Sequence, residues 1–212
     1  MTTAIIGTGN IGSSIARGLV AGGEKVLLAS ANQSSAEELA SRLGGKATTV
    51  SVEDAFDRAD TIILAVWFDV SKELLTKYRE QLHGKLIIDP SNAIALDDGD
   101  GFIKTIGDTE SAGQILQSFL PADASLVKAF GTLAAPTLAA ATTKHEQKIV
   151  GFYAADDEPS SEKAEQLLMA AGLDPIRVGG IDQSSRIEVF GDLHEFGALG
   201  KTVNRQEALA AI

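Results

Sequence analysis

Near its N-terminus the chain reads Ala4-Ile5-Ile6-Gly7-Thr8-Gly9-Asn10-Ile11-Gly12, a short apolar run that leads directly into the pattern G-x-G-x-x-G. Residues 13–20, which follow, have the composition of a helix. Between a strand and a helix, the first glycine permits a tight turn, the second lets a pyrophosphate approach the backbone, and the third allows close packing of helix on strand. The segment therefore predicts a dinucleotide-binding β-α-β unit, with a phosphate site formed by Gly7, Thr8, Gly9, Asn10, Ile11 and Gly12.

The composition argues against several classes of function. A net charge of −11 over 212 residues disfavours binding to nucleic acid or to an anionic membrane, because both require basic patches. The chain has no Cys, and its three His residues (His83, His145 and His194) lie far apart, so no metal site is expected. No apolar run reaches the ~18–20 residues that span a bilayer. The first strand leaves no room for a signal peptide, so a soluble cytoplasmic protein is expected.

Apolar runs of strand length alternate with amphipathic segments along almost the whole chain. This alternation predicts an α/β protein of the Rossmann type, with a doubly wound, mostly parallel sheet of about eight strands and a smaller C-terminal helical part. We expect residues 1–122 to form the NAD(P)-binding domain. Residues 123–212 are expected to continue the sheet and close the active-site cleft.

Four segments carry specific structural expectations. We expect a helix over residues 71–81 and a longer one over residues 181–199, kinked at Gly191. The small residues of 131–141 are expected to serve for close packing, or, as a loop that leaves the carboxyl end of a strand, to accept a flat ring. The acidic segment 96–101 resembles a calcium loop only superficially, because it lacks the twelve-residue pattern that ends in Glu. A solvated loop is expected there.

The end of the second strand bears on the choice of dinucleotide. An NAD-binding protein usually has a carboxylate there, whereas this chain reads Ser30-Ala31-Asn32-Gln33-Ser34-Ser35. No carboxylate would repel a 2′-phosphate, so we expect NADP(H) rather than NAD, contacted by Ser30, Asn32 and Ser34. The segment also lacks Arg, and NAD stays possible. Ser34 or Ser35 can equally cap the next helix.

Two further loops follow buried strands and are expected at the same crevice. Val66 and Trp67 come after one strand, and Pro90 and Asn92 come after the next. Because ligands of doubly wound sheets bind at the carboxyl ends of the strands, these residues are placed where a nicotinamide would pass. The alternatives are that Trp67 only packs in the core and that Asp89 only caps its loop.

Four motifs together resemble the family of coenzyme F420-dependent NADP oxidoreductases, which is related to the reductase domain of the STEAP metalloreductases. They are Ile6-Gly7-Thr8-Gly9-Asn10-Ile11-Gly12, Ala65-Val66-Trp67, Ile88-Asp89-Pro90-Ser91-Asn92 and Val127-Lys128-Ala129-Phe130-Gly131-Thr132. The resemblance implies hydride transfer between NADP(H) and a second ring cofactor, coenzyme F420 or a flavin. The second ring would lie in a pocket made by the Pro90 loop, the Thr132 loop and the last helix. A homodimer is the expected assembly.

The chain differs from the usual family pattern at Ala31, Ala93 and Gly131. Two other functions therefore stay open. A reductase of a small carbonyl or imine would need a proton donor, for which Lys128, His194 and Asp89 are candidates, and Thr132 completes the set of possible catalytic residues. A non-catalytic sensor would bind the dinucleotide without oxidising it.

Overall fold

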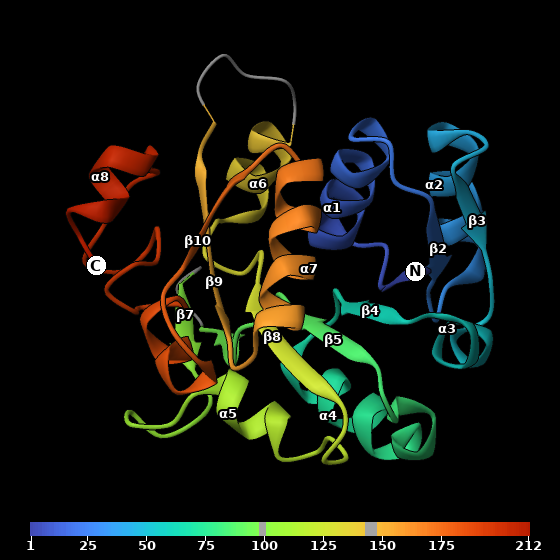
Figure 1. Ribbon diagram of the computed structural model, residues 1–212, viewed down its shortest axis with the longest axis horizontal. Helices are drawn as coiled ribbons and strands as arrows, with labels where there is room; N and C mark the ends of the chain where they lie inside the picture. The colour runs from blue at the N-terminus through green and yellow to red at the C-terminus, as the bar shows by residue number, and fades with distance from the viewer. Residues whose placement is uncertain (98–100, 143–147) are drawn as a thin grey trace.

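A computed structural model describes residues 1–97, 101–142 and 148–212 of the chain. Its centre is an eight-stranded sheet with the order β10-β9-β8-β5-β4-β1-β2-β3 (Figure 1). The strands of this sheet are β1 (Thr3–Ile6), β2 (Val26–Ala29), β3 (Ala47–Thr49), β4 (Thr61–Leu64), β5 (Leu86–Asp89), β8 (Ser125–Ala129), β9 (Val150–Ala155) and β10 (Asp174–Arg177).

All neighbouring strands of this sheet are parallel except β8 and β9, which pair antiparallel. The expected doubly wound, mostly parallel sheet is thereby confirmed. Strand β1 lies between β2 and β4, so the chain winds outward from β1 in both directions. This reversal of the strand order opens a crevice at the carboxyl ends of β1 and β4, where ligands of such sheets bind. The sheet continues across residue 122, because β5 pairs with β8.

Successive side chains of each strand point to opposite faces of the sheet. Both faces are apolar, and helices cover both. Ile5 faces one apolar core, whereas Ala4 and Ile6 face the other. The first core includes residues of α1 (Asn10–Ala21), α2 (Gln33–Leu43), α6 (Ala135–Ala141) and α7 (Glu158–Ala170). The second includes residues of α3 (Val52–Arg58), α4 (Phe68–Lys77), η1 (Arg79–Leu82), α5 (Ala112–Gln117), η2 (Ile181–Arg186) and α8 (Arg205–Leu209).

The prediction of a long helix over residues 181–199 is wrong. Only the 3-10 helix η2 forms there, and the chain then folds back on itself in a series of turns. Phe190 has a left-handed backbone, with φ of 72°. A side chain at Gly191 would collide with the Ser185 and Arg186 carbonyls, and one at Gly197 would collide with the Gly191 carbonyl. These close backbone contacts replace the helix.

Two other expectations are corrected. The helix expected over 71–81 begins three residues earlier, at Phe68, and ends at Lys77, with η1 continuing from Arg79. The small-residue segment 131–141, expected as a loop, contains the helix α6. Pro136 lies in the first turn of α6, where its missing N–H costs no intrahelical hydrogen bond.

A two-stranded antiparallel sheet, not expected from the sequence, lies beside the main sheet. It consists of β6 (Ile94–Leu96) and β7 (Phe102–Lys104), with Ala95 opposite Ile103. Residues 98–100 of the expected acidic loop lie outside the described residues. The pair leaves β5 at the carboxyl end of the main sheet, and this position brings Ile94 and Phe102 to the crevice.

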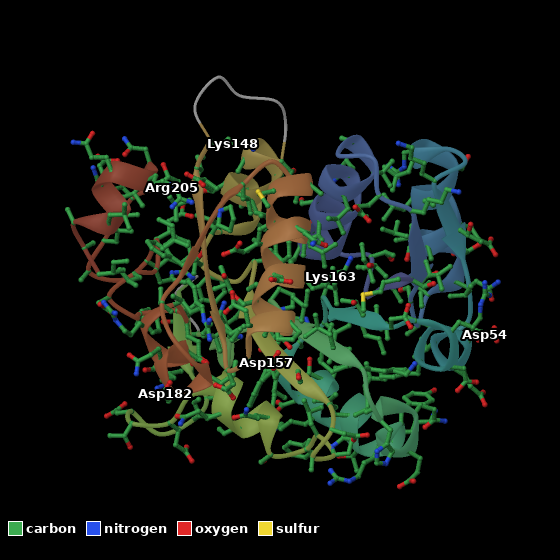
Figure 2. The ribbon with its side chains drawn as sticks, viewed as in Figure 1. Asp54, Lys148, Asp157, Lys163, Asp182 and Arg205 are labelled. Atoms are coloured by element: carbon green, nitrogen blue, oxygen red, sulfur yellow. The ribbon has the colours of Figure 1, made fainter. Side chains whose placement is uncertain are left out.

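Charged side chains lie mainly outside these cores, and Asp54 and Asp182 project from the periphery of the ribbon (Figure 2). Asp157 caps α7, because its carboxylate accepts the Ser160 N–H across 2.8 Å. Arg205 of α8 donates to Asp174 at the start of β10, which fastens the C-terminal helix to the sheet. Among the helices described, none combines the length and the apolarity needed to cross a membrane.

Candidate active site

Two glycines of the first loop are required by close backbone packing. Gly7 has a φ of +101°, and a side chain there would collide with the Ala65 carbonyl at the end of β4. A side chain at Gly12 would collide with the Gly7 carbonyl. These two positions bring α1 against the end of β1 and hold the loop between the first and fourth strands.

Gly9 has a different role, because a Cβ added there would have no heavy atom within 4 Å. It is the N-cap of α1, no side chain caps this helix, and no acidic residue lies in its first turn. The first N–H groups of the helix therefore have no intrahelical acceptor. They form the positive end of the helix dipole, and this end faces open space. This geometry fits the pyrophosphate of a dinucleotide.

The end of β2 is organised by hydrogen bonds around Asn32. Its Oδ1 accepts from the Ser34 hydroxyl at 2.7 Å and from the Ser35 N–H at 3.4 Å, and Asn32 is the N-cap of α2. The expectation that Ser34 or Ser35 caps this helix is therefore wrong. The Asn32 N–H reaches the Ser30 hydroxyl at 3.3 Å, and the hydroxyls of Ser35 and Thr8 lie 2.7 Å apart. The polar segment expected to contact the adenosine ribose is thus linked to the glycine loop by the hydrogen bond between Ser35 and Thr8.

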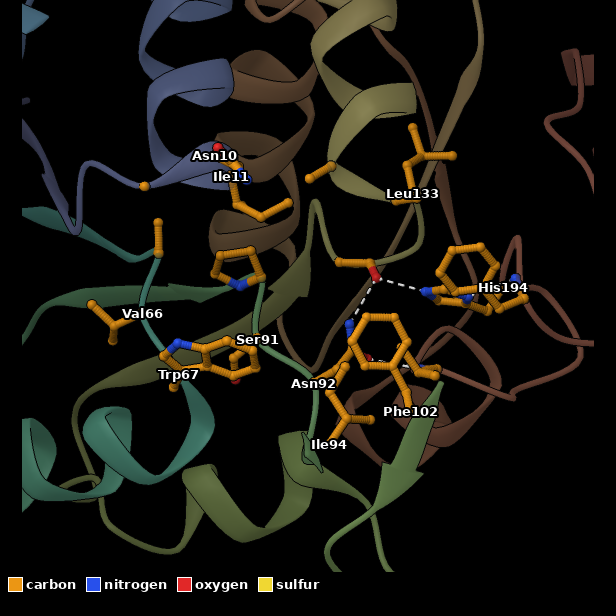
Figure 3. Close-up of a pocket in the computed structure, with 18 of the residues that line it drawn as sticks. Asn10, Ile11, Val66, Trp67, Ser91, Asn92, Ile94, Phe102, Leu133 and His194 are labelled. Carbon is orange, nitrogen blue, oxygen red and sulfur yellow. Dashed lines mark hydrogen bonds between the residues drawn. The ribbon is translucent and has the colours of Figure 1, made fainter. Parts of the chain in front are cut away.

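A cavity of about 560 Å³ extends from the glycine loop across the carboxyl ends of the strands (Figure 3). It brings together eight residues singled out from the sequence, namely Gly9, Asn10, Ile11, Val66, Trp67, Pro90, Asn92 and His194. The remaining lining residues are Ala65, Ser91, Ile94, Phe102, Gly131, Leu133, Ala134, Ala135, Pro136, Val189 and Phe196. The cavity therefore joins the predicted phosphate site to a wall made mainly of apolar side chains.

Aromatic side chains from three separate segments form part of this wall. Trp67 is 60% exposed, and Phe102 and Phe196 are 38% and 47% exposed. The rings of Phe102 and Phe196 stack with their centroids 6.4 Å apart. Large exposed aromatic groups that converge on one cavity indicate a surface for a flat ligand.

Asn92 joins three parts of the chain at the far end of the cavity. Its Nδ2 donates to the Gly131 carbonyl at 3.0 Å, and its Oδ1 accepts the Val189 N–H at 2.8 Å. The loops after β5 and β8 and the C-terminal segment are thereby fixed to one another. A side chain at Gly131 would press on the Pro90 carbonyl, 2.8 Å from its Cβ, so this contact requires glycine.

His194 is the second donor to the Gly131 carbonyl (Figure 3). Its Nδ1 accepts the Phe196 N–H at 2.9 Å, so the ring proton of the neutral imidazole must lie on Nε2, which donates to Gly131 across 3.0 Å. Burial lowers the pKa of His194 below its usual 6.5 and outweighs the hydrogen bond to Gly131 and the nearby Glu195 carboxylate, which favour the charged form. His194 is therefore a neutral imidazole with both nitrogens engaged.

Lys128 and Asp89 form a buried ion pair beneath the Pro90 loop, 1% and 0% exposed, with Nζ 2.5 Å from Oδ2. The ammonium also donates to the Ser91 carbonyl, and the Asp89 Oδ1 accepts the Ser91 N–H at 2.8 Å. Lys128 and Thr132, both expected as catalytic candidates, are buried and do not line the cavity. The ion pair instead fixes the backbone of Ser91, because Lys128 binds its carbonyl and Asp89 binds its N–H.

Several site residues had no signal in the sequence. Phe102 and Val189 reach the cavity only because the hairpin and the folded C-terminal segment bring them there. The hydroxyl of Ser91, a buried residue of the wall, has no hydrogen-bond partner within the described part of the chain. The described residues contain no cluster of acidic, His or Cys side chains able to hold a metal ion.

One family model matches the N-terminal part of the chain. The family model described as NADP oxidoreductase, coenzyme F420-dependent, matches residues 2–93. The dinucleotide-binding part of the chain matches this family. The match runs from β1 to the loop after β5 and confirms the resemblance at the three motifs that lie within these residues. It supports an NAD(P)H-dependent oxidoreductase. No curated protein matches the sequence significantly.

Solved structures share the fold over most of the chain. A hypothetical protein from Sinorhizobium meliloti has a TM-score of 0.83 and 26% identity, over 97% of this chain and 96% of that one. A proposed F420-dependent NADP reductase from Arthrobacter sp. FB24 has a TM-score of 0.72 and 22% identity, over 86% of each chain. An imine reductase from Myxococcus stipitatus, in complex with NADP⁺, has a TM-score of 0.62 and 19% identity, over 94% of this chain and 58% of that chain.

Proposed function

We propose that this chain transfers hydride between NADP(H) and a flat conjugated ring, such as coenzyme F420 or a flavin, bound in the aromatic part of the cavity. The family match over residues 2–93 supports the dinucleotide half of this proposal. The shape and chemistry of the cavity support the other half. A small imine is the second candidate acceptor.

One observation carries the proposal, which is the continuity of the cavity from Gly9 and Asn10 to Phe102 and Phe196. The first end offers unpaired backbone N–H groups to a pyrophosphate, and the second offers aromatic surface to a flat ring. A direct transfer between two rings needs both to lie in one space from which water is largely excluded. The cavity provides one continuous space for both rings, and its mainly apolar wall would limit the access of water once the rings are bound.

The side chains of the wall are suited to positioning rather than to proton transfer. Among the described lining residues His194 alone is titratable, and both of its ring nitrogens are engaged. NADP(H), when bound, donates or accepts hydride at the nicotinamide. The hydrogen bond from Asn92 to Gly131 and the Asp89–Lys128 pair fix the loops that form the wall, whose side chains are mainly apolar.

The proposed preference for NADP(H) rests on the residues at the end of β2. Hydroxyl groups of Ser30, Ser34 and Ser35 lie at the N-terminus of α2, where a phosphate is stabilised by backbone N–H groups and by the helix dipole. The segment contributes no carboxylate to repel a 2′-phosphate and no Arg to bind it. Discrimination against NADH is therefore expected to be moderate.

The second candidate, reduction of a small imine, is favoured by the same lack of a free proton donor. A protonated imine already carries the proton that its nitrogen keeps in the product, whereas a carbonyl needs one from the protein. Lys128 and Asp89 cannot supply it without breaking their buried pair. The imine alternative is thus better matched to the wall than the carbonyl alternative.

A binding and single-turnover experiment tests the proposal. NADPH, NADH and coenzyme F420 are titrated separately, and the NADPH complex is then mixed in a stopped-flow instrument with coenzyme F420, a flavin and a cyclic imine. We expect binding of NADPH and its oxidation by at least one of these acceptors. Tight binding of NADPH with no oxidation by any acceptor would instead identify a dinucleotide sensor.

A further inference from the structure

We infer that the hydroxyl of Ser91 binds the carboxamide group of the nicotinamide and so fixes the orientation of that ring for hydride transfer. This role rests on the proposed function, which assigns nothing to the Ser91 side chain. It follows from an unpaired buried hydroxyl, from the contacts that hold the Ser91 backbone, and from the place of Ser91 along the cavity.

Ser91 carries a buried hydroxyl that no described group of the protein satisfies. The residue is only 7% exposed, and its Oγ has no hydrogen-bond partner within the described part of the chain. A buried hydroxyl without a partner is unfavourable, because it has given up its hydrogen bonds to water. Such groups are few in folded proteins, so this one calls for a partner from outside the chain.

The neighbouring polar side chains of the wall are already engaged. Asn92 bonds Gly131 and Val189, and both ring nitrogens of His194 are in hydrogen bonds. Ser91 lines the same cavity (Figure 3). Among the described lining residues, Ser91 is therefore the buried polar side chain that is left to contact a ligand.

The backbone of Ser91 is fixed, whereas its hydroxyl can turn. Its N–H donates to the Asp89 Oδ1 across 2.8 Å, and its carbonyl accepts from Lys128. Asp89 and Lys128 are themselves buried and paired. A serine hydroxyl moves between staggered positions by rotation about a single bond. Since the Ser91 hydroxyl leaves no hydrogen bond to a described residue when it turns, rotation toward a ligand costs little.

The order of the strands places Ser91 at the nicotinamide. The cavity passes the loops after β1, β4, β5 and β8, and these strands are neighbours in that order. Adjacent strands lie about 4.8 Å apart, so the loop after β5 is about 10 Å from the loop after β1. With the pyrophosphate on the glycine loop, the ribose lies by the loop after β4 and the nicotinamide by the loop after β5, which carries Ser91.

The proposed acceptor lies farther along the cavity. Figure 3 shows Trp67 and Ser91 toward one side of the site and Phe102 and His194 toward the other. Phe102 belongs to the aromatic surface to which the acceptor ring is assigned. Ser91 is therefore on the dinucleotide side of the transfer.

A carboxamide matches a serine hydroxyl in chemistry. Its oxygen accepts a hydrogen bond and its NH₂ group donates one, and a serine hydroxyl can do either. A bond at this substituent restrains rotation of the nicotinamide, so that one face of the ring is presented to the acceptor. Ser91 exchanges no proton and forms no covalent bond in this role.

The test measures binding rather than turnover. NADPH and 2′-phospho-ADP-ribose, which has the same phosphates and adenosine but no nicotinamide, are titrated by calorimetry into the native protein and Ser91→Ala. Loss of one hydrogen bond should weaken NADPH binding by Ser91→Ala about threefold to tenfold. The affinity for 2′-phospho-ADP-ribose should stay the same.

Thermal unfolding separates a ligand contact from a structural one. Because the Ser91 Oγ bonds no described group, Ser91→Ala should leave the thermal midpoint of the unliganded protein unchanged or raise it. Ser71→Ala is the matched control, since Ser71 of α4 is fully buried, also has an unpaired hydroxyl and does not line the cavity. This control should bind both ligands with native affinity.

Several results would overturn the role of Ser91. Native affinity for NADPH in Ser91→Ala is one, including the case in which only the KM for the acceptor rises. An equal loss of affinity for both ligands, or a lower thermal midpoint without ligand, would show a structural role instead.

The proposed function fails by a different result. Native protein that binds NADPH but transfers no hydride to coenzyme F420, a flavin or a cyclic imine would contradict hydride transfer, while the binding difference of Ser91→Ala would still assign Ser91 to the nicotinamide. Absence of NADPH binding to the native protein would overturn both.

Discussion

His194 donates its Nε2–H to the carbonyl oxygen of Gly131 across 3.0 Å, and this bond ties the C-terminal segment to the loop after β8. The imidazole therefore has a structural role in the cavity wall. A structural residue and a proton donor respond differently to substitution.

Substitution of His194 distinguishes these two roles. His194→Gln retains an N–H donor for the Gly131 carbonyl, so most of the turnover should remain. His194→Phe removes both hydrogen bonds and should lower the free energy of unfolding by about 1–3 kcal/mol, since it leaves the partly buried Phe196 N–H without its acceptor. The measurements are steady-state NADPH oxidation and urea unfolding. Loss of all turnover in His194→Gln, with unchanged stability, would show that His194 supplies a proton.

The lowered pKa of His194 predicts how stability depends on pH. Its ordinary value is 6.5, and burial lowers the pKa in the folded protein. Below pH 6.5 the unfolded chain therefore binds a proton that the folded protein does not, and the free energy of unfolding falls as the pH falls toward the folded-state pKa. Above pH 6.5, where His194 is neutral in both states, this group contributes no pH dependence. In urea unfolding at pH values on both sides of 6.5, the slope of stability against pH below 6.5 should be steeper in the native protein than in His194→Gln by up to about 1.4 kcal/mol per pH unit.

Because the ion pair between Asp89 and Lys128 is buried, loss of one partner alone should destabilise the protein. Lys128→Met leaves a buried carboxylate without its cation, which is expected to cost about 3–5 kcal/mol. The double variant Asp89→Asn/Lys128→Met removes both charges and keeps an oxygen to accept the Ser91 N–H, so it should recover most of that loss. Urea denaturation of the three proteins measures the effect. A double variant no more stable than Lys128→Met would contradict this account of the pair.

Two glycines of the first loop should separate binding from folding. Gly9→Val places its side chain in open space, so the protein should fold normally and lose NADPH affinity by about a hundredfold or more through exclusion of the pyrophosphate. Gly12→Ala brings its Cβ onto the Gly7 carbonyl and should lower the thermal midpoint. NADPH titration and thermal unfolding of both variants provide the comparison. Native affinity in Gly9→Val would remove the phosphate site from this loop.

The fold was predictable where local pattern is sufficient. Alternating apolar and amphipathic segments identified the eight strands of the main sheet, and the glycine spacing identified the loop after β1, because both features are set by neighbouring residues. The segment after η2 was not predictable in this way. Its composition is typical of a helix, yet Gly191 and Gly197 make backbone contacts that no periodic pattern records.

The candidate site was predictable in its dinucleotide half and at Asn92 and His194, but not at Phe102 or Val189. Phe102 and Phe196 meet although they are far apart in the chain, and the hairpin that carries Phe102 consists of two strands of three residues each. Lys128 had the residue type of a proton donor, but its pairing with Asp89, 39 residues away, depends on the register between β5 and β8. Contacts of this kind arise from the tertiary fold and leave no mark on residue spacing.

The transfer of hydride itself can be followed directly with NADPH carrying deuterium at both C4 positions of the nicotinamide. The complex is mixed in ordinary water with coenzyme F420 or a cyclic imine as acceptor, and the product is analysed by mass spectrometry after one turnover. Direct transfer predicts one deuterium on the reduced carbon of every product molecule. A product that carries only hydrogen from solvent at that carbon would contradict the account.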